Sequence, residues 1–282
     1  MKRFNGIALS VAFCSLASQA ALAQTKIDTL KVQNLNEVIV KGVRAAKEAP
    51  YAVANIRKSE LKQFSCSGQE LPFLLSRTPG ILAWSENGIG TGTTYMRIRG
   101  AAGSRINVTL DGVALNSPED QTVFWANMNS YSSLLGSIQV QRGVGSSTNG
   151  DGAFGGSISM ATAAPSLTPT AEVTGSFGSY NTYHTGASFS TGLLGKHLIF
   201  DGAYHETATD GYVDGTEGRS GSYYGGLTWL SDNFKVSYKN IGNFEKTGQA
   251  WNGVLGGDYN SNFSLLQDGI RTYKDMYLSL IH

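Results

Sequence analysis

The chain has 282 residues, which allows one or two domains. Charged residues make up 15% of it and the formal net charge is +1, so nothing indicates nucleic acid as a partner. The 35 glycines favour backbone conformations and close approaches that side chains would forbid.

The first 23 residues have the pattern of a secretory signal peptide. Lys2-Arg3 supplies a positive start, Ile7–Ala17 is apolar, and Ala21-Leu22-Ala23 predicts cleavage after Ala23. The apolar run is too short to span a bilayer. The chain is therefore expected to be exported, and Cys66, the one cysteine left after cleavage, would form no internal disulfide.

Residues 24–44 are expected to form an N-terminal arm. The arm contains a short β-prone run, Leu35-Asn36-Glu37-Val38-Ile39-Val40. Such a run on a tether suits pairing with the exposed sheet edge of another protein, where main-chain hydrogen bonds supply the affinity. Alternatively, Val38–Val43 forms the first strand of the following domain.

A helical region is predicted over Ser59–Arg77. Ser67 could cap a helix with Glu70 three residues later. Three leucines would then share one helix face, namely Leu71, Leu74 and Leu75. Thr78-Pro79-Gly80 should end the helix and lead into a strand over Ile81–Trp84.

Two further strands are predicted over Tyr95–Gly100 and Val108–Val113, paired with each other, with Asp111-Gly112 as a turn signal. Four side chains should alternate across the first of these strands, Met96 and Ile98 on one face, Arg97 and Arg99 on the other.

Aromatic residues mark two loops. Phe124 and Trp125 lie at the expected apex of a loop over Ser117–Asn129, and Trp84 lies in another loop. Exposed aromatic rings there could stack on a ligand. The alternative is that these rings pack in the core.

The stretch from Ser137 to Thr162 reads as two strands around a glycine-rich segment. Apolar and polar residues alternate around Ile138 and Ile158, which is strand spacing. The segment Gly150–Gly155 satisfies the dinucleotide fingerprint G-x-G-x-x-G, but a strand follows it where that fingerprint requires a helix. Nucleotide binding is therefore not predicted.

Beyond Pro165 the chain becomes rich in aromatic residues and in two-residue alternation. Val236 and Tyr238 oppose Lys235, Ser237 and Lys239, for example. Apolar side chains facing outward and polar ones facing inward are typical of transmembrane β-barrel strands. A soluble antiparallel sandwich would give a similar pattern.

Residues 166–282 allow about six membrane-spanning strands, at roughly 10 residues per strand plus connections. Six strands cannot enclose a domain of more than about a hundred residues, since the lumen of even an eight-stranded barrel is nearly filled by its own side chains. The sequence is therefore expected to be a fragment or a truncated product that transports nothing by itself.

Several motifs together resemble the plug domain of TonB-dependent outer-membrane receptors. They occur in the order of that family: Leu71 to Ile81 (with LLSRTPGI), Met96–Gly100 (MRIRG), Leu110-Asp111-Gly112, Arg142-Gly143, Ala153, Gly155-Gly156, Ile158 and Thr162. Gly150-Asp151 stands where the family usually has Tyr-Gly, a small departure.

The resemblance implies an α+β plug domain, a small mixed sheet with short helices, followed by antiparallel transmembrane β-barrel strands of an incomplete barrel. The implied domains are the signal peptide (1–23), the arm (24–44), the plug (45–165) and the first part of the barrel (166–282). Leu35–Val40 would be the TonB box, bound by a TonB-type periplasmic energy transducer. The implied location is the outer membrane, in contact with its lipid.

The resemblance also implies a function, the energised import of a scarce ligand. An iron–siderophore, haem or cobalamin ligand, that is a small metal chelate or vitamin, is favoured because the N-terminal domain common in large-glycan importers is missing. The implied plug–barrel contacts are Arg97, Arg99, Gly100, Asp111, Gly112, Arg142, Gly143, Gly155 and Gly156. The three arginines would pair with carboxylates of the barrel lumen. The alternative is that they are solvated.

Two other classes of function remain as alternatives to transport. A soluble or surface binding protein with a plug-like fold would need no barrel closure. An enzyme is not predicted, because the four histidines show no metal-ligand spacing apart from His205-Glu206, and no Ser/His/Asp set has a supporting context. No catalytic residue, cofactor or metal site is expected.

Overall fold

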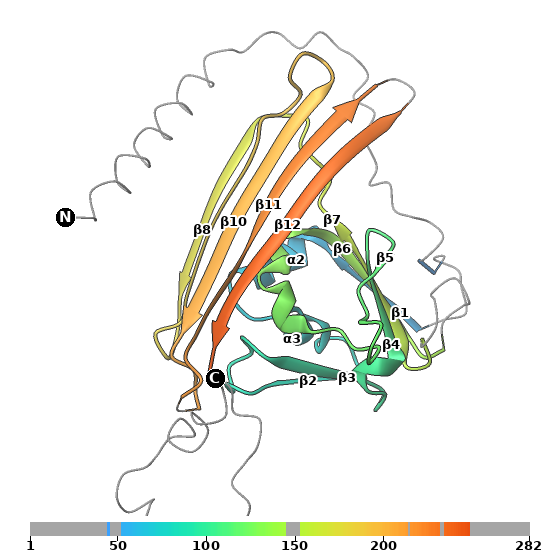
Figure 1. The fold of residues 1–282 in the computed structure, drawn as a ribbon, viewed down its shortest axis with the longest axis vertical. Coiled ribbons are helices and arrows are strands. Elements are labelled where there is room, and N and C mark those ends of the chain that lie inside the picture. The colour runs from blue at the N-terminus through green and yellow to red at the C-terminus, as the bar shows by residue number, and fades with distance from the viewer. Residues whose placement is uncertain (1–43, 46–51, 145–152, 214, 232–233, 249–282) are drawn as a thin grey trace, which may run out of the picture. The chain divides into compact units, whose positions relative to one another are not determined.

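The computed structural model describes residues 44–45, 52–144, 153–213, 215–231 and 234–248 (Figure 1). The chain divides into two units, Met1–Asn36 and Glu37–His282, and every described residue lies in the second. The signal peptide, its cleavage site and the run Leu35–Val40 lie outside the described residues. No helix in the described ranges is long and apolar enough to cross a membrane.

The elements before Pro165 form a first domain of mixed secondary structure. In chain order they are β1 (Ala52–Arg57), α2 (Lys58–Ser65), α3 (Leu71–Leu75), β2 (Ile81–Ser85), β3 (Thr94–Ile98), the 3₁₀ helix η1 (Gly103–Arg105), β4 (Ile106–Leu110), β5 (Val113–Ala114), the 3₁₀ helix η2 (Trp125–Met128), α4 (Tyr131–Leu134), β6 (Leu135–Arg142) and β7 (Gly156–Thr162).

The main sheet of this domain has the strand order β1-β6-β7-β4-β5. β4 and β7 run parallel, with Val108 opposite Ile158, and the other neighbours are antiparallel. Every residue of the central strand β7 is buried, so both faces of the sheet are covered there. The strands predicted around Ile138 and Ile158 are confirmed as β6 and β7, and the small mixed sheet agrees with the predicted α+β class.

The helical region predicted over Ser59–Arg77 contains two short helices, α2 and α3. Gly68 adopts φ +69° between them, and the amide of Glu70 donates to the carbonyl of Gly90. The predicted Ser67 cap is wrong, because the Ser67 hydroxyl donates to the Phe64 carbonyl and Glu70 itself is the N-cap of α3. The three leucines of α3 are buried, as expected from their shared face.

Strand pairing also differs from the prediction. β3 pairs with β2, not with the strand that contains Val108, and the latter pairs with β7 and β5. Met96 and Ile98 are buried and Arg97 is exposed, as alternation predicts. Arg99 lies beyond the strand at φ 49°, so it does not share the strand face of Arg97. The turn at Asp111-Gly112 is confirmed, with both residues at positive φ.

A second sheet follows, built from five long antiparallel strands in the order β12-β11-β10-β9-β8 (Figure 1). They are β8 (Thr170–Phe177), β9 (Tyr183–Ser190), β10 (Leu198–Thr209), β11 (Gly218–Leu230) and β12 (Lys235–Thr247). Within the described residues β8 and β12 each pair on one side only, so this sheet is not closed.

The two faces of the second sheet differ in chemistry. Val173 and Phe177 of β8, Phe200 of β10 and Val236 and Tyr238 of β12 expose apolar surface on one face. The opposite face carries polar side chains, many of them buried, among them His184, His205, Thr207, Ser220 and Ser222. The predicted alternation is confirmed, with five strands in the part of the chain that the structure describes.

Candidate functional site

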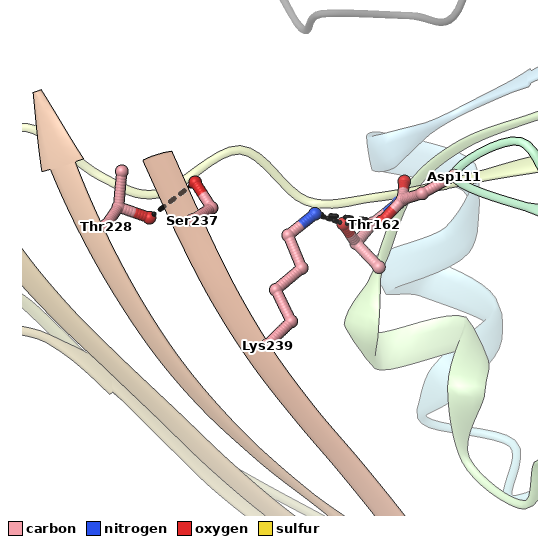
Figure 2. Close-up of polar contacts among 5 residues, drawn as sticks. All are labelled: Asp111, Thr162, Thr228, Ser237 and Lys239. Carbon is pink, nitrogen blue, oxygen red and sulfur yellow. Dashed lines mark hydrogen bonds and ion pairs between the residues drawn. The ribbon is translucent and has the colours of Figure 1, made fainter. Parts of the chain in front are cut away.

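Asp111 joins the first domain to the second sheet. Its carboxylate lies at the β4–β5 turn and accepts hydrogen bonds from the amide (2.9 Å) and hydroxyl (2.8 Å) of Thr162, the last residue of β7. Lys239 of β12 extends from the second sheet, and its Nζ lies 2.8 Å from Asp111 Oδ2 and also donates to Thr162 Oγ1 (Figure 2). The turn therefore ties the end of the first domain to the polar face of β12.

The charge state of Asp111 follows from this geometry. Burial raises its pKa, but the hydrogen bonds from Lys239 and Thr162 outweigh burial and hold the pKa below the usual value. The carboxylate is therefore ionised at neutral pH. About a third of each side chain stays exposed, which limits the pair to a modest contribution to stability.

Other polar contacts follow the same face of the second sheet. Lys62 of α2 lies 2.8 Å from Glu172 of β8. The amide of Tyr212, in the β10–β11 connection, donates to the carbonyl of Asn87 at 2.9 Å. On the sheet itself, Thr228 and Ser237 share a hydrogen bond of 3.1 Å close to Lys239 (Figure 2). The first domain thus contacts the polar face through several segments.

The three predicted arginines do not pair with carboxylates in the described ranges. Arg97 lies over the ring of Trp84, 5.9 Å from its centre. Arg142 donates from Nη1 to the Pro79 carbonyl at 2.7 Å, a contact inside the first domain. Their pairing with barrel carboxylates stays a prediction, and so does the role of Arg99.

The predicted glycines have local roles in the first domain. Gly100 and Gly112 adopt positive φ in turns. The amide of Gly143 donates to the Gly155 carbonyl at 2.9 Å. A Cβ at Gly155 would lie 2.3 Å from Ala101 Cβ, and one at Gly156 would lie 2.6 Å from the Gln141 carbonyl oxygen. Of the residues predicted to contact the barrel, Asp111 alone forms a hydrogen bond or ion pair with the described strands of the second sheet.

The aromatic residues proposed for ligand binding separate into two kinds. Trp84 and Phe124 are exposed, and Trp84 stacks on Tyr95 with 5.5 Å between ring centres. Burial and the neighbouring Glu86 raise the pKa of Tyr95 to about 12, so its hydroxyl stays protonated. Trp125 follows the alternative stated from the sequence, core packing, since its ring is buried within the core cluster.

Sequence reasoning missed the partner of Asp111. Lys239 was expected only as an inward-facing residue, and 128 positions separate the two. Because Lys239 alternates with Val236 and Tyr238, the sequence correctly placed it on the polar face of β12. Nothing in the neighbouring sequence indicates that it pairs with Asp111. No cluster of three or more His, Cys, Asp or Glu residues that could hold a metal is present in the described part of the chain.

Comparison with known proteins agrees with this architecture. Residues 45–157 match the family model "TonB-dependent Receptor Plug Domain". No curated protein matches the chain. The chain therefore contains a TonB-dependent receptor plug, and the antiparallel strands after it form an unclosed sheet consistent with an incomplete barrel.

Solved structures share this fold at low identity. FpvA of P. aeruginosa, solved with heterologous pyoverdines, is 19% identical with a TM-score of 0.58, over 72% of this chain and 26% of that one. The copper transporter OprC is 15% identical, with a TM-score of 0.59 over 73% of this chain and 33% of that one.

The ferric yersiniabactin uptake receptor FyuA from Yersinia pestis is 17% identical with a TM-score of 0.54, over 72% of this chain and 33% of that one. This chain thus spans about a quarter to a third of the length of these solved proteins.

Proposed function

We propose that this chain forms the plug and first barrel strands of an outer-membrane receptor that imports a scarce metal chelate. The observation that supports the proposal most is the tie from Asp111 and Thr162 to Lys239, on the polar face of a sheet whose other face is apolar. A sheet with this division of faces suits a lipid surface outside and a polar lumen inside.

The ligand class is part of the proposal. Similar structures include receptors named for pyoverdine and yersiniabactin and a copper transporter. An iron–siderophore is therefore the first candidate, ahead of haem and cobalamin. Trp84 and Phe124 offer exposed aromatic surface on the plug that an apolar or aromatic part of a chelate could contact.

Energy would enter through the N-terminal arm. In this proposal the signal peptide is removed after Ala23 and Leu35–Val40 pairs with a TonB-type transducer in the periplasm. The arm leads to Arg44, whose guanidinium donates to the hydroxyls of Ser137 and Ser159, and then to β1, the edge strand of the plug sheet. Within the described residues β1 has one paired neighbour, β6, so traction on the arm would act on β1 first.

The test is uptake of radiolabelled ferric siderophores by cells that carry or lack the gene, with and without a protonophore. Val38→Pro removes a main-chain donor from the proposed TonB box and should abolish uptake while surface binding remains. Thr29→Pro, in the same arm but outside the run, is the matched control and should leave uptake intact.

Uptake that persists in the Val38→Pro variant or under protonophore would contradict energised import. Recovery of the mature protein in the soluble fraction without detergent would instead support the alternative, a plug-like binding protein with no transport activity.

A further inference from the structure

Among the residues that the structure describes, three buried oxygen atoms lack a hydrogen-bond donor where the plug meets the end of β12. They are Glu70 Oε2, Asn129 Oδ1 and Glu245 Oε1. Glu70 is 3% exposed and Asn129 is completely buried. Buried polar atoms in folded proteins nearly always have a partner, so three acceptors without a donor in one region indicate a missing cationic or donor group.

These residues come from three segments that meet. Glu70 precedes α3, and its amide donates to the carbonyl of Gly90 at 2.8 Å. Asn129 follows η2, and its Nδ2 lies 3.5 Å from Glu245 Oε2. Glu245 Oε1 lies 3.6 Å from where a Cβ on Gly92 would stand. α3 contacts η2, and η2 contacts β12, so the plug and the strand contribute to one site.

The two carboxyl groups of this region have no basic partner in the part of the chain that is described. Burial first, and the charge of Glu245 second, raise the pKa of Glu70 well above its usual value. A buried Glu70 and a half-buried Glu245 without a counter-charge are costly, and the cost falls if a cation binds between them.

The available ligands are all oxygen atoms. Two carboxylates and an amide carbonyl are the ligands that hard divalent cations such as Ca²⁺ prefer, with water completing the coordination. A cavity of about 10 Å³ borders Glu245 but neither Glu70 nor Asn129, and its other lining residues include Thr91, Ser220, Thr247 and the basic residues Arg219 and Lys246. It has room for about one water molecule beside Glu245.

We propose that Glu70, Asn129 and Glu245 form a Ca²⁺ site that ties the plug to β12. Lys239 and Glu245 are six residues apart on one strand, so the cation would be a second tie about 20 Å from the first. With only two carboxylates the affinity should be weak, with a Kd on the order of 10⁻⁴ to 10⁻³ M. The inference depends on how the plug packs against β12 and not on transport.

The test is a calorimetric Ca²⁺ titration of the full protein, purified in lipopolysaccharide-free detergent at constant ionic strength, together with thermal unfolding. Glu70→Gln and Glu245→Gln should each weaken Ca²⁺ binding at least tenfold and remove the rise in melting temperature. Asn129→Asp adds a third carboxylate and should tighten binding about tenfold. Glu119→Gln, at an exposed plug carboxylate, is the matched control and should leave binding unchanged.

Two results would overturn the proposal. The first is Ca²⁺ binding that is equal in wild type, Glu70→Gln and Glu245→Gln, because the cation would then bind elsewhere. The second is a wild-type protein that shows no response to Ca²⁺ while Glu70→Gln alone raises the melting temperature at pH 7. Glutamine mimics a protonated carboxyl group, so that result would mean that a proton occupies the place of the cation. Ferric chelate uptake in the same variants is a separate readout.

Discussion

The two main sheets of this molecule have five strands each in the described residues. They differ in where their apolar side chains lie, which is in a buried core in the plug sheet and on an exposed face in the second sheet. In the plug sheet the apolar residues face a core, and Ile138 and Ile158 are almost fully buried. In the second sheet Val173 and Phe177 are 84% and 78% exposed, while polar residues on the opposite face are buried. The plug sheet also includes one parallel pair, β4 and β7, whereas the described strands of the second sheet all pair antiparallel.

Whether a face of a sheet is apolar therefore depends on what surrounds that face, water, lipid or the protein's own core. The hydrophobic effect drives apolar surface out of water, so a row of exposed apolar side chains along several strands would favour association in an aqueous setting. In lipid the same surface carries no such cost. The second sheet is therefore built for an apolar exterior, and the plug sheet for an interior of its own.

The largest expected effect is in the plug core. Ile138→Ala should lower the free energy of unfolding of the plug by about 2–5 kcal/mol, because it leaves a cavity in a fully buried position. Val236→Ala, on the exposed face of β12, should change it little. Denaturant unfolding in detergent, followed by the fluorescence of the buried Trp125, measures both. Equal losses would contradict the comparison.

A charge placed on the apolar face of the second sheet tests whether that face contacts lipid. Val236→Lys should cost about 2–4 kcal/mol in a bilayer if the position lies near its middle. Asn243→Lys, on the same strand but on the polar face, should be tolerated. The amount of each variant inserted in the outer membrane, normalised to expression, is the readout. Equal insertion of the two variants would argue against a lipid-facing surface.

Glycines give a matched pair of smaller effects. A Cβ at Gly156 would lie 2.6 Å from the Gln141 carbonyl oxygen, whereas one at Gly225 of β11 meets nothing within 4 Å. Gly156→Ala should therefore destabilise the plug by about 1–3 kcal/mol through overpacking. Gly225→Ala should be close to neutral. Thermal unfolding of the two variants compares them directly, and a neutral Gly156→Ala would refute the close packing of β7.

The smallest expected effect is at the tie between the sheets. Lys239→Met should lower the free energy of unfolding by about 0.2–1 kcal/mol, since both side chains of the pair are about a third exposed.

The same pair should make stability depend on pH. The pKa of Asp111 is lowered in the folded state, so the stabilisation from its carboxylate is present above about pH 4, the unfolded value, and is lost as pH falls through the folded pKa. Unfolding curves from pH 7 to pH 2 should show a smaller acid loss in Lys239→Met, and an unchanged loss would contradict the pairing.

Local patterns predicted much of this fold. The alternation around Ile138, Ile158 and Val236 gave the strands and, for β12, the correct faces, because side-chain period follows directly from strand geometry. The Asp111-Gly112 turn followed from residue types that tolerate positive φ. These features depend on neighbours in the sequence, so the sequence alone contains the information.

Long-range pairing was not predictable in the same way. The partner of β3 and the contact between Asp111 and Lys239 depend on how separate elements meet. The helical region expected over Ser59–Arg77 is divided into α2 and α3 because Gly68 turns the chain and the Glu70 amide donates to the carbonyl of Gly90 in another loop. For Trp125 the sequence left ligand contact and core packing both open, and the choice depends on how η2 packs against the core, where its ring is buried.

The arrangement of a core-packed plug beside a lipid-facing sheet is tested most directly by depth-resolved fluorescence quenching in vesicles with brominated lipids. Two variants would each keep one tryptophan, Trp229 on the exposed face of β11 or the buried Trp125 of the plug, with the remaining tryptophans replaced by phenylalanine. Strong quenching of Trp229 and no quenching of Trp125 are expected. Trp229 that escapes the lipid quencher but is quenched by aqueous iodide, or Trp125 quenched as strongly as Trp229, would contradict this arrangement.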